Sequence, residues 1–299
     1  MRKPPAWAIE AHRRALPVIL IAAAAAAAMS CVDRAAAQQL PDLVDRHTLR
    51  VCSDPENMPF SNRKKEGFEN RIADIIGDEL KRPVRYYWLQ QGPGFVRNTL
   101  ATGLCDVIIG YASGADIVQH TNPYYASTYV LVVKADGPLA GVTKLEDPAL
   151  KGRRFGIIAG TPPGDHLQRL GLIANARSYG LTLDQQDNAA GKEAIDDLVA
   201  GNTDGALLWG PIAGYYASKA AKPLKVIPLV QESERPLLAY RITFGIRANE
   251  TQWKHTLNAA IRKHAKEIAQ VLSDYGVPQV SVDSLPAERP NLAAGQVQE

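Results

Sequence analysis

The sequence predicts an α/β protein of two lobes that enclose a cleft and are joined by two crossover strands. Three observations predict this fold class. Strand and helix patterns alternate from Leu49 onward, the alternation starts again after residues 134–141, and one more strand follows Arg235. Alternating strands and helices form sheets that helices cover on both faces. Because the chain returns to its first unit, we expect a cleft between the two units, where α/β folds bind ligands.

The elements of the first unit follow from apolar runs and their spacing. Residues 49–52 are a short apolar run that ends at polar residues and Pro55, which predicts a buried strand. Apolar residues within 68–80 recur with the period of one helix face, which predicts an amphipathic helix. The other expected elements are strands at 84–89, 106–110 and 129–133 and a short helix at 94–101.

The second unit repeats this pattern. A strand at 155–159 leads into a Gly- and Pro-rich loop, after which Asp165 is expected to cap a helix. The remaining elements are helices at 192–200 and from Pro211, strands at 206–209 and 241–247, and one long helix at 250–275 that Gly276 and Pro278 end. We therefore expect lobe 1 at residues 45–133 and 238–278, lobe 2 at 134–237, and a loose C-terminal tail at 279–299.

The first 37 residues predict a secretory signal peptide. Basic residues precede an apolar run at 16–29, which is too short to span a bilayer comfortably. Residues 35–37 are all Ala and provide a cleavage site before Gln38, whereas the residues around Cys31 match a lipoprotein site poorly. We therefore expect an exported, periplasmic protein without a membrane anchor.

The formal net charge of +3 belongs to this leader. Removing the leader takes away five basic and two acidic residues, which leaves 29 of each in the rest of the chain. A neutral chain has no electrostatic footprint for nucleic acid or for an anionic membrane surface. Neither is expected as a partner, and the remaining 262 residues are long enough for two hydrophobic cores.

Two cysteines, Cys52 and Cys105, follow the leader. An oxidising compartment favours a disulfide between them. Cys52 ends one predicted strand and Cys105 precedes another, and a Cα separation above about 7 Å would forbid the bond. The sequence therefore leaves two alternatives open, a disulfide or two small buried residues on neighbouring strands.

The chain shows no motif for catalysis or for metal binding. It has no G-x-S-x-G, S-x-x-K or H-E-x-x-H string, and the five histidines after the leader are scattered. His255 and His264 share a predicted helix, but nine residues place them on opposite faces. His166, at a helix start beside the Gly/Pro loop, is expected to line the cleft as a polar residue. We expect no catalytic residue, no metal site and no cofactor.

Aromatic residues gather where the predicted strands end. They are Phe60, Tyr111, Tyr124, Tyr125, Trp209, Tyr215 and Tyr216. Two interpretations remain open: these rings pack between helix and sheet, or they line a broad apolar cleft with few charges.

Short motifs in a fixed order resemble the periplasmic solute-binding proteins of the polar amino-acid type, family 3. They lie at 49–51, 67–69, 106–109, 123–125, 159–161, 204 and 245–247, and the resemblance extends from about residue 49 to 275. It implies the periplasmic binding protein-like fold of type II, with two α/β lobes joined by two crossover strands.

Longer strings resemble a narrower group, the quinoprotein dehydrogenase-associated binding proteins of the MoxJ/XoxJ type, found beside methanol dehydrogenases. These strings are residues 49–62, 66–73, 94–100, 209–216 and 275–278. The resemblance implies a non-enzymatic periplasmic accessory protein that interacts with a PQQ-dependent alcohol (methanol) dehydrogenase and assists its maturation or activation. The c-type cytochrome of such a system is a second partner to consider.

The departures from amino-acid receptors agree with this resemblance. Those receptors bind the ligand carboxylate with an Arg soon after the strand that matches 106–110, and the ammonium with an Asp where this chain has Trp209. Residues 111–123 contain no Arg, and an indole cannot accept a hydrogen bond from an ammonium. Each lost partner costs about 3–5 kcal/mol, against about 8 kcal/mol for micromolar binding. Free amino acids are therefore not expected as ligands.

The residues expected to line the cleft are Asp54, Phe60, Glu69, Tyr111, Tyr124, Thr161, His166, Trp209 and Tyr215. Asp54 and Glu69 would orient an occupant by hydrogen bonds, or alternatively would cap a turn and a helix. Two rival functions remain. One is a solute receptor of an ABC transporter for a small apolar or alcohol-derived ligand. The other is a lyase or dehydratase, for which only Glu69, Asp54 and His166 qualify as general acid.

Overall fold

The computed structural model describes residues 43–114, 117–180, 189–232 and 234–285. The predicted signal peptide lies outside the described residues, as does most of the predicted C-terminal tail. None of the described helices is both long and apolar enough to cross a membrane.

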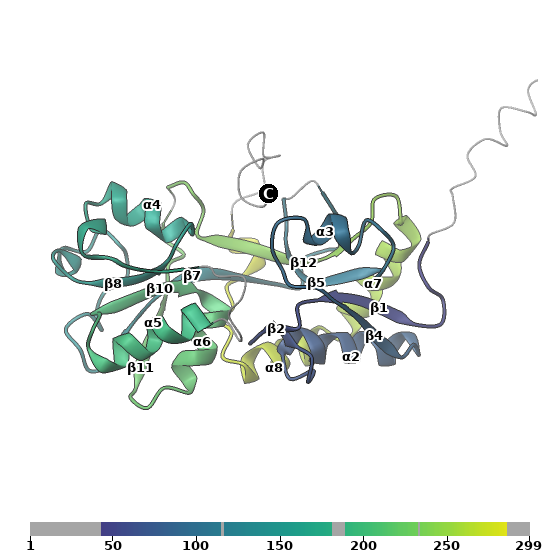
Figure 1. Ribbon diagram of the computed structural model, residues 1–299, viewed down its shortest axis with the longest axis horizontal. Helices are drawn as coiled ribbons and strands as arrows, with labels where there is room; N and C mark the ends of the chain where they lie inside the picture. Colours follow the sequence, from purple (N-terminus) through teal and green to yellow (C-terminus); the bar gives the residue numbers. More distant parts are fainter. Residues whose placement is uncertain (1–42, 115–116, 181–188, 233, 286–299) are drawn as a thin grey trace, which may run out of the picture. The chain divides into compact units, whose positions relative to one another are not determined.

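A ten-stranded sheet runs through the described chain, with the strand order β4-β1-β5-β12-β7-β10-β8-β9 (Figure 1). Its strands are β1 (Leu49–Ser53), β4 (Val84–Trp88), β5 (Val107–Ala112), β7 (Tyr125–Lys134), β8 (Phe155–Ile158), β9 (Arg177–Tyr179), β10 (Gly205–Trp209) and β12 (Ala239–Ile246), with β6 (Gln119–His120) on β12 and β11 (Leu224–Pro228) on β7. A separate hairpin pairs β2 (Glu56–Asn57) with β3 (Ser61–Asn62).

Two long strands, β7 and β12, connect the lobes. They pair antiparallel from Ala239 opposite Thr128 to Ile242 opposite Tyr125. On one side β12 joins the parallel strands β5, β1 and β4, and on the other side β7 joins β10, which is parallel to β8 and β9. The predicted α/β fold of two lobes is confirmed. The sheet is mixed rather than parallel, because both connecting strands run against their neighbours.

Helices cover both parts of the sheet (Figure 1). In lobe 1 they are α2 (Phe68–Leu80), α3 (Phe95–Asn98), α7 (Thr251–Lys263) and α8 (Ala265–Asp274), and in lobe 2 they are α4 (Pro162–Arg169), α5 (Ala189–Ala200) and α6 (Gly210–Ser218). Short 3₁₀ turns lie at Pro148–Leu150, Ile173–Asn175 and Val282–Ser284.

Alternation along β7 shows how lobe 2 is packed. Leu131 and Val133 belong to one buried cluster and Val130 and Val132 to another, because successive side chains of a strand point to opposite faces. Lobe 1 has its main core between α2, α7, α8 and the sheet. Each lobe therefore buries its own apolar core. The exact residue limits of the lobes stay a prediction.

Two predicted helices differ from the structure. The long helix expected at 250–275 is two helices, because His264 (φ −101°, ψ 17°) leaves the helical conformation between α7 and α8. Its ring bonds Glu79 and Glu267, at 2.9 Å each. In lobe 2, α4 begins at Pro162 with Thr161 at the N-cap, so Asp165 lies inside the first turn instead of capping it. Two prolines with preset φ explain the earlier start.

The two cysteines form a disulfide in the structure. Their Cα atoms are 5.4 Å apart, within the range that the bond requires. Both side chains are buried in a small apolar cluster beneath α3. The bond joins the end of β1 to the loop before β5.

Candidate functional site

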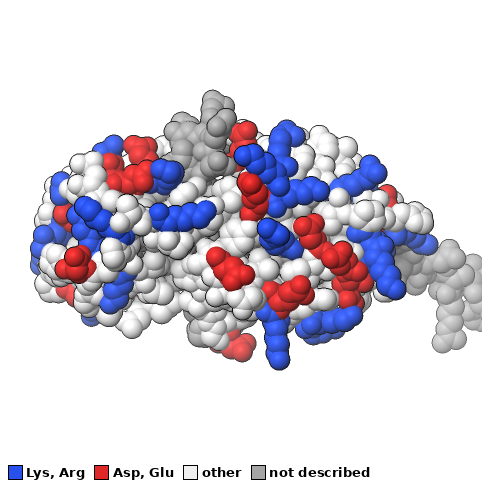
Figure 2. Space-filling view, turned by 90° about the horizontal axis from the view of Figure 1, so that it is seen from below, with Lys and Arg blue, Asp and Glu red and all other residues white. Residues whose placement is uncertain are grey.

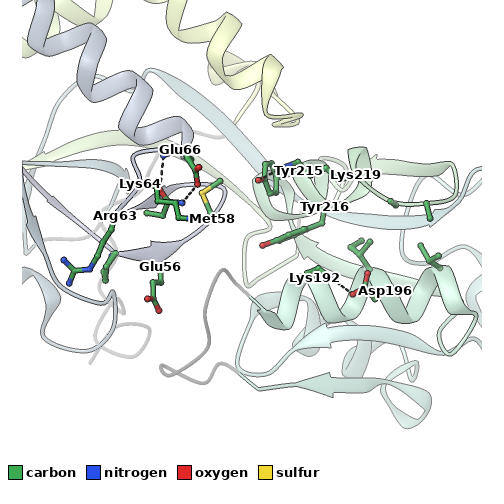
Figure 3. Close-up of a pocket in the computed structure, with 16 residues that line it drawn as sticks. Glu56, Met58, Arg63, Lys64, Glu66, Lys192, Asp196, Tyr215, Tyr216 and Lys219 are labelled. Carbon is green, nitrogen blue, oxygen red and sulfur yellow. Dashed lines mark hydrogen bonds and ion pairs between the residues drawn. The ribbon is translucent and has the colours of Figure 1, made fainter.

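A cavity of about 700 Å³ lies between lobe 1 and the helices α5 and α6 of lobe 2 (Figure 3). This volume is within the range of small-molecule and cofactor sites. Sixteen residues line it: Pro55, Glu56, Met58, Asn62, Arg63, Lys64 and Glu66 from lobe 1, and Lys192, Ile195, Asp196, Val199, Tyr215, Tyr216, Lys219, Ala220 and Ala221 from lobe 2. We call it the inter-lobe cavity.

The lobe 1 wall is the hairpin of β2 and β3 with the turn that follows it. The carboxylate of Asp54 accepts hydrogen bonds from the backbone N–H groups of Glu56 (2.8 Å) and Gln91 (2.6 Å). Farther along, the Asn62 side chain donates to the Glu66 carboxylate and accepts from the Glu66 backbone, both at 2.9 Å. These local bonds hold the wall in one conformation.

The lobe 2 wall presents a tyrosine pair from α6 and the lysine that caps the end of this helix. The Nζ atom of Lys219 lies 3.9 Å from the centre of the Tyr215 ring and 2.6 Å from its hydroxyl oxygen. The rings of Tyr215 and Tyr216 meet edge to face, with centroids 5.1 Å apart. On α5, Lys192 pairs with Asp196 at 2.6 Å. A cation held against an aromatic ring is a favourable contact at such a surface.

The cavity carries more charge than the sequence indicated. Four basic and three acidic residues are among those that line it. Figure 2 shows the same mixture on a larger scale, with Lys and Arg interspersed among Asp and Glu over the face seen from below. Of the two interpretations left open for the aromatic residues, a broad apolar cleft with few charges does not describe this cavity. The sequence predicted the helices α5 and α6 themselves. It did not show that polar positions on their outer faces line the cavity.

Of the nine predicted cleft residues, only Tyr215 lines the inter-lobe cavity. Asp54 is buried and each of its carboxylate oxygens already accepts a backbone N–H. Its alternative interpretation, turn capping, is what these contacts support.

Glu69 lies in the first turn of α2, 6% exposed, with its carboxyl against the bare Cα of Gly110. Burial raises the pKa of this carboxyl well above its usual value, and the Asp54 carboxylate adds to the effect. The environment therefore favours the protonated form. Gly110, at φ +81°, has room for this contact because it has no side chain.

Four predicted aromatic residues pack against other rings instead of lining the inter-lobe cavity. Phe60 contacts Phe68, Tyr124 contacts Tyr125 and Phe244, Trp209 contacts Tyr129 and Tyr240, and Tyr111 contacts His120, with ring centroids 4.9–5.9 Å apart. These contacts support the packing interpretation, with Phe60 against a helix and the other three against rings of neighbouring strands.

His166 is completely buried, which corrects its expected place in the cleft. Its Nε2 atom lies 2.8 Å from the carbonyl oxygen of Pro236, and its Nδ1 atom 2.8 Å from Nη2 of Arg169. These partners require a proton on Nε2, which is donated to Pro236, and a lone pair on Nδ1. His166 thus connects α4 to the chain before β12.

Thr161, another of the predicted cleft residues, does not line the inter-lobe cavity. Its hydroxyl donates to the Ile158 carbonyl at 2.7 Å.

The sequence reasoning missed most of the cavity lining. Met58, Lys64, Lys192 and Lys219 were not singled out, because a charged or flexible residue on a turn or helix surface has no sequence signal of its own. Tyr216 was recognised as one of the aromatic residues at strand ends but was not included among the expected cleft residues.

Comparison with known proteins decides the family. Residues 49–276 match the model of the bacterial extracellular solute-binding proteins, family 3. The chain belongs to this family. Among the described residues of this family-3 protein, no group of three or more His, Cys, Asp or Glu could hold a metal ion.

Three relatives place it more narrowly. The periplasmic binding protein XoxJ from Methylobacterium extorquens AM1 is 47% identical, over 78% of this chain and 100% of that one, with a TM-score of 0.67. MxaJ from Methlophaga aminisulfidivorans MPT is 28% identical, with the same coverages and a TM-score of 0.71. Protein MoxJ of Methylorubrum extorquens is 26% identical over 254 residues, 80% of this chain and 84% of that protein. The resemblance to the MoxJ/XoxJ type is confirmed.

The structure also shows what this family-3 member has at the position of Trp209. The indole packs between Tyr129 of β7 and Tyr240 of β12, at centroid distances of 5.3 and 5.9 Å. The indole itself cannot accept a hydrogen bond from an ammonium group. That free amino acids are not ligands stays a prediction.

Proposed function

We propose that this protein is a non-enzymatic periplasmic accessory protein of methanol oxidation, exported by a cleaved signal peptide. Its inter-lobe cavity binds a segment of a PQQ-dependent alcohol dehydrogenase and assists that enzyme's maturation or activation. The proposal rests on one observation: residues of both lobes line the cavity, in a chain that is 47% identical to XoxJ.

The composition of the cavity supports a protein segment as its occupant. Tyr215 and Tyr216 provide rigid amphipathic surface, and Met58 is a flexible apolar side chain. Tyrosine, methionine and arginine are enriched where proteins contact one another. Charges of both signs around these residues would select the register of a bound segment.

The geometry argues against the three general acids that the sequence offered for a lyase or dehydratase. A general acid must come within hydrogen-bond reach of its substrate. None of the three candidates lines the cavity: the carboxylate of Asp54 is bonded to backbone N–H groups, His166 is buried between Pro236 and Arg169, and Glu69 lies against Gly110.

The test is a binding measurement between purified mature protein and the PQQ dehydrogenase of the same periplasm. The variant Tyr215→Ala/Tyr216→Ala removes both rings. Tyr87→Ala is the matched control, because Tyr87 is 37% exposed and lies outside the cavity. If the pair forms a hot spot worth about 2 kcal/mol, affinity falls about 30-fold in the variant and is unchanged in the control. Absence of binding, or equal affinities for all three proteins, would contradict the proposal.

A solute receptor of an ABC transporter is the second candidate, because the family is one of solute-binding proteins and the cavity volume suits a small ligand. A thermal-shift screen with short alcohols and their aldehyde and acid products separates the two. A true ligand at 100 times its Kd should add about 2.7 kcal/mol of stability. Such a response, together with no binding to the dehydrogenase, would favour the receptor.

A further inference from the structure

The chain after α8 crosses both strands that connect the lobes. We call residues 275–285 the C-terminal strap. In Figure 1 it is the yellow segment that leaves α8 and passes β7 and β12. The Val280 N–H donates to the Ala126 carbonyl at 3.0 Å, in an antiparallel bridge, and the Ser127 hydroxyl donates to the Pro278 carbonyl at 2.7 Å. The strap is thus bonded to β7.

The strap is also bonded to the other connecting strand. Nη2 of Arg241, in β12, donates to the carbonyl oxygens of Val282 at 3.0 Å and Leu285 at 2.6 Å. The lobes would have to turn about β7 and β12. A side chain from each of these two strands is hydrogen-bonded to the C-terminal strap. Charge-assisted bonds of this kind are stronger than neutral ones.

Helix α6 of lobe 2 lies directly on the strap. A Cβ on Gly214 would overlap the carbonyl oxygen of Gly276, and a Cβ on Gly210 would stand 3.4 Å from Cγ of Pro278. The two glycines are four residues apart and share one helix face. Gly276 itself adopts φ +68°, which turns the strap out of α8. The helix and the strap are in backbone-to-backbone contact.

Tyr275 joins this contact to both walls of the inter-lobe cavity. Its ring stacks on Tyr215 of lobe 2, with centroids 6.0 Å and planes 16° apart, and meets Phe68 of lobe 1 edge-on at 5.9 Å. Its hydroxyl donates to the Glu66 carbonyl. Upstream, Ile268 and Leu272 anchor α8 in the lobe 1 core.

From these contacts we propose that the C-terminal strap holds the two lobes in one arrangement, so that the inter-lobe cavity stands open before any occupant arrives. Turning the lobes about β7 and β12 would move α6 against the strap. The glycine contact leaves no space for small adjustments, because packed interfaces shift between discrete arrangements rather than deform continuously. This holds whatever occupies the cavity, so it goes beyond the proposed function.

Distances between spin labels test it without a partner. Labels at Arg71→Cys on α2 and Gln168→Cys on α4 report on the two lobes, since both positions are exposed on helices. In the otherwise unchanged mature protein we expect one narrow distance distribution that added dehydrogenase or alcohols do not shift. A broad or two-peaked distribution in this protein would overturn the proposal, whatever the variants do.

Two variants then identify the strap as the cause. Gly214→Val should broaden the distribution, whereas Gly141→Val should not, because no atom lies within 4 Å of a Cβ at Gly141. A chain that ends at Gln279 removes the Val280 bridge and the Arg241 acceptors and should broaden it as well. Circular dichroism checks that each variant is folded. Folded variants that keep the narrow distribution would show that the strap does not hold the lobes.

Discussion

Arg247 donates to the buried carboxylate of Asp106 across 141 residues of sequence, at 2.7 Å. The pair connects the end of β12, the strand that returns from lobe 2, to the residue before β5. Arg50 of β1 bonds the same carboxylate through two nitrogens, at 2.6 and 2.7 Å. Asp106 has no exposed side-chain surface, so two arginines neutralise and bond a fully desolvated charge. This carboxylate holds three strands of lobe 1 in register.

Asp106→Asn should therefore lower the free energy of unfolding by about 3 kcal/mol, because Arg50 and Arg247 lose the buried carboxylate that they share, while Arg247 keeps its ion pair with Glu250. Urea unfolding followed by circular dichroism measures this. Asp196→Asn is the control, since its pair with Lys192 is exposed and worth at most about 1 kcal/mol. Equal losses in both variants would contradict this account of Asp106.

Gly110→Ala should cost more stability than Gly103→Ala, although both glycines have a positive φ, +81° and +76°. The strain of a left-handed residue, about 1–2 kcal/mol, is common to both. Only at Gly110 would the new Cβ overlap the Glu69 carboxyl, which adds about 1–3 kcal/mol of overpacking. The difference between the two unfolding free energies isolates that contact, and a difference of zero would show that Glu69 moves aside freely.

Glu69→Gln should flatten the dependence of stability on pH. An unfolded Glu ionises near pH 4.5, whereas burial and then Asp54 raise the pKa of folded Glu69. Between these values the folded state binds more protons than the unfolded state, so stability falls as pH rises. Gln has the shape of the protonated side chain without the titration. Unfolding at pH 5 to 8 measures the slope, and an unchanged slope in the variant would contradict this account of Glu69.

His264→Ala should cost more stability at pH 6 than at pH 9. Hydrogen bonds to Glu79 and then Glu267 raise the pKa of the His264 ring, so the folded state holds its proton longer. That stabilisation is fully present below the unfolded pKa of 6.5 and is lost as pH rises through the folded value. Thermal unfolding at the two pH values measures it. A loss of stability that is equal at the two pH values would contradict this account of His264.

Much of the fold could be predicted because each element leaves a local pattern. The apolar period of 68–80, the Gly/Pro loop before α4 and the Gly276 stop all act within a few residues of chain. The break at His264 could not be predicted in this way. It depends on Glu79, nearly two hundred residues away, which bonds the imidazole where the helix would otherwise continue.

The candidate site was harder to predict for the same reason. Tyr215 was found because an aromatic residue after a strand is a conspicuous local feature. Asp54 and His166 lie beside sequence features that are equally easy to recognise. Their polar atoms are nevertheless hydrogen-bonded to Gln91 and to Pro236, which only folding brings near.

The sequence by itself determined the two-lobed α/β class, the neutral charge of residues 38–299 and the resemblance to MoxJ/XoxJ-type proteins, since these depend on composition, period and short strings. The tertiary structure alone decided which side chains line the inter-lobe cavity, that Cys52 and Cys105 meet, and that the C-terminal strap contacts both connecting strands. These features depend on which distant parts of the chain come into contact. The roles of Gly214 and Gly276, for example, follow from the contact between their backbones, which the local sequence of neither residue indicates.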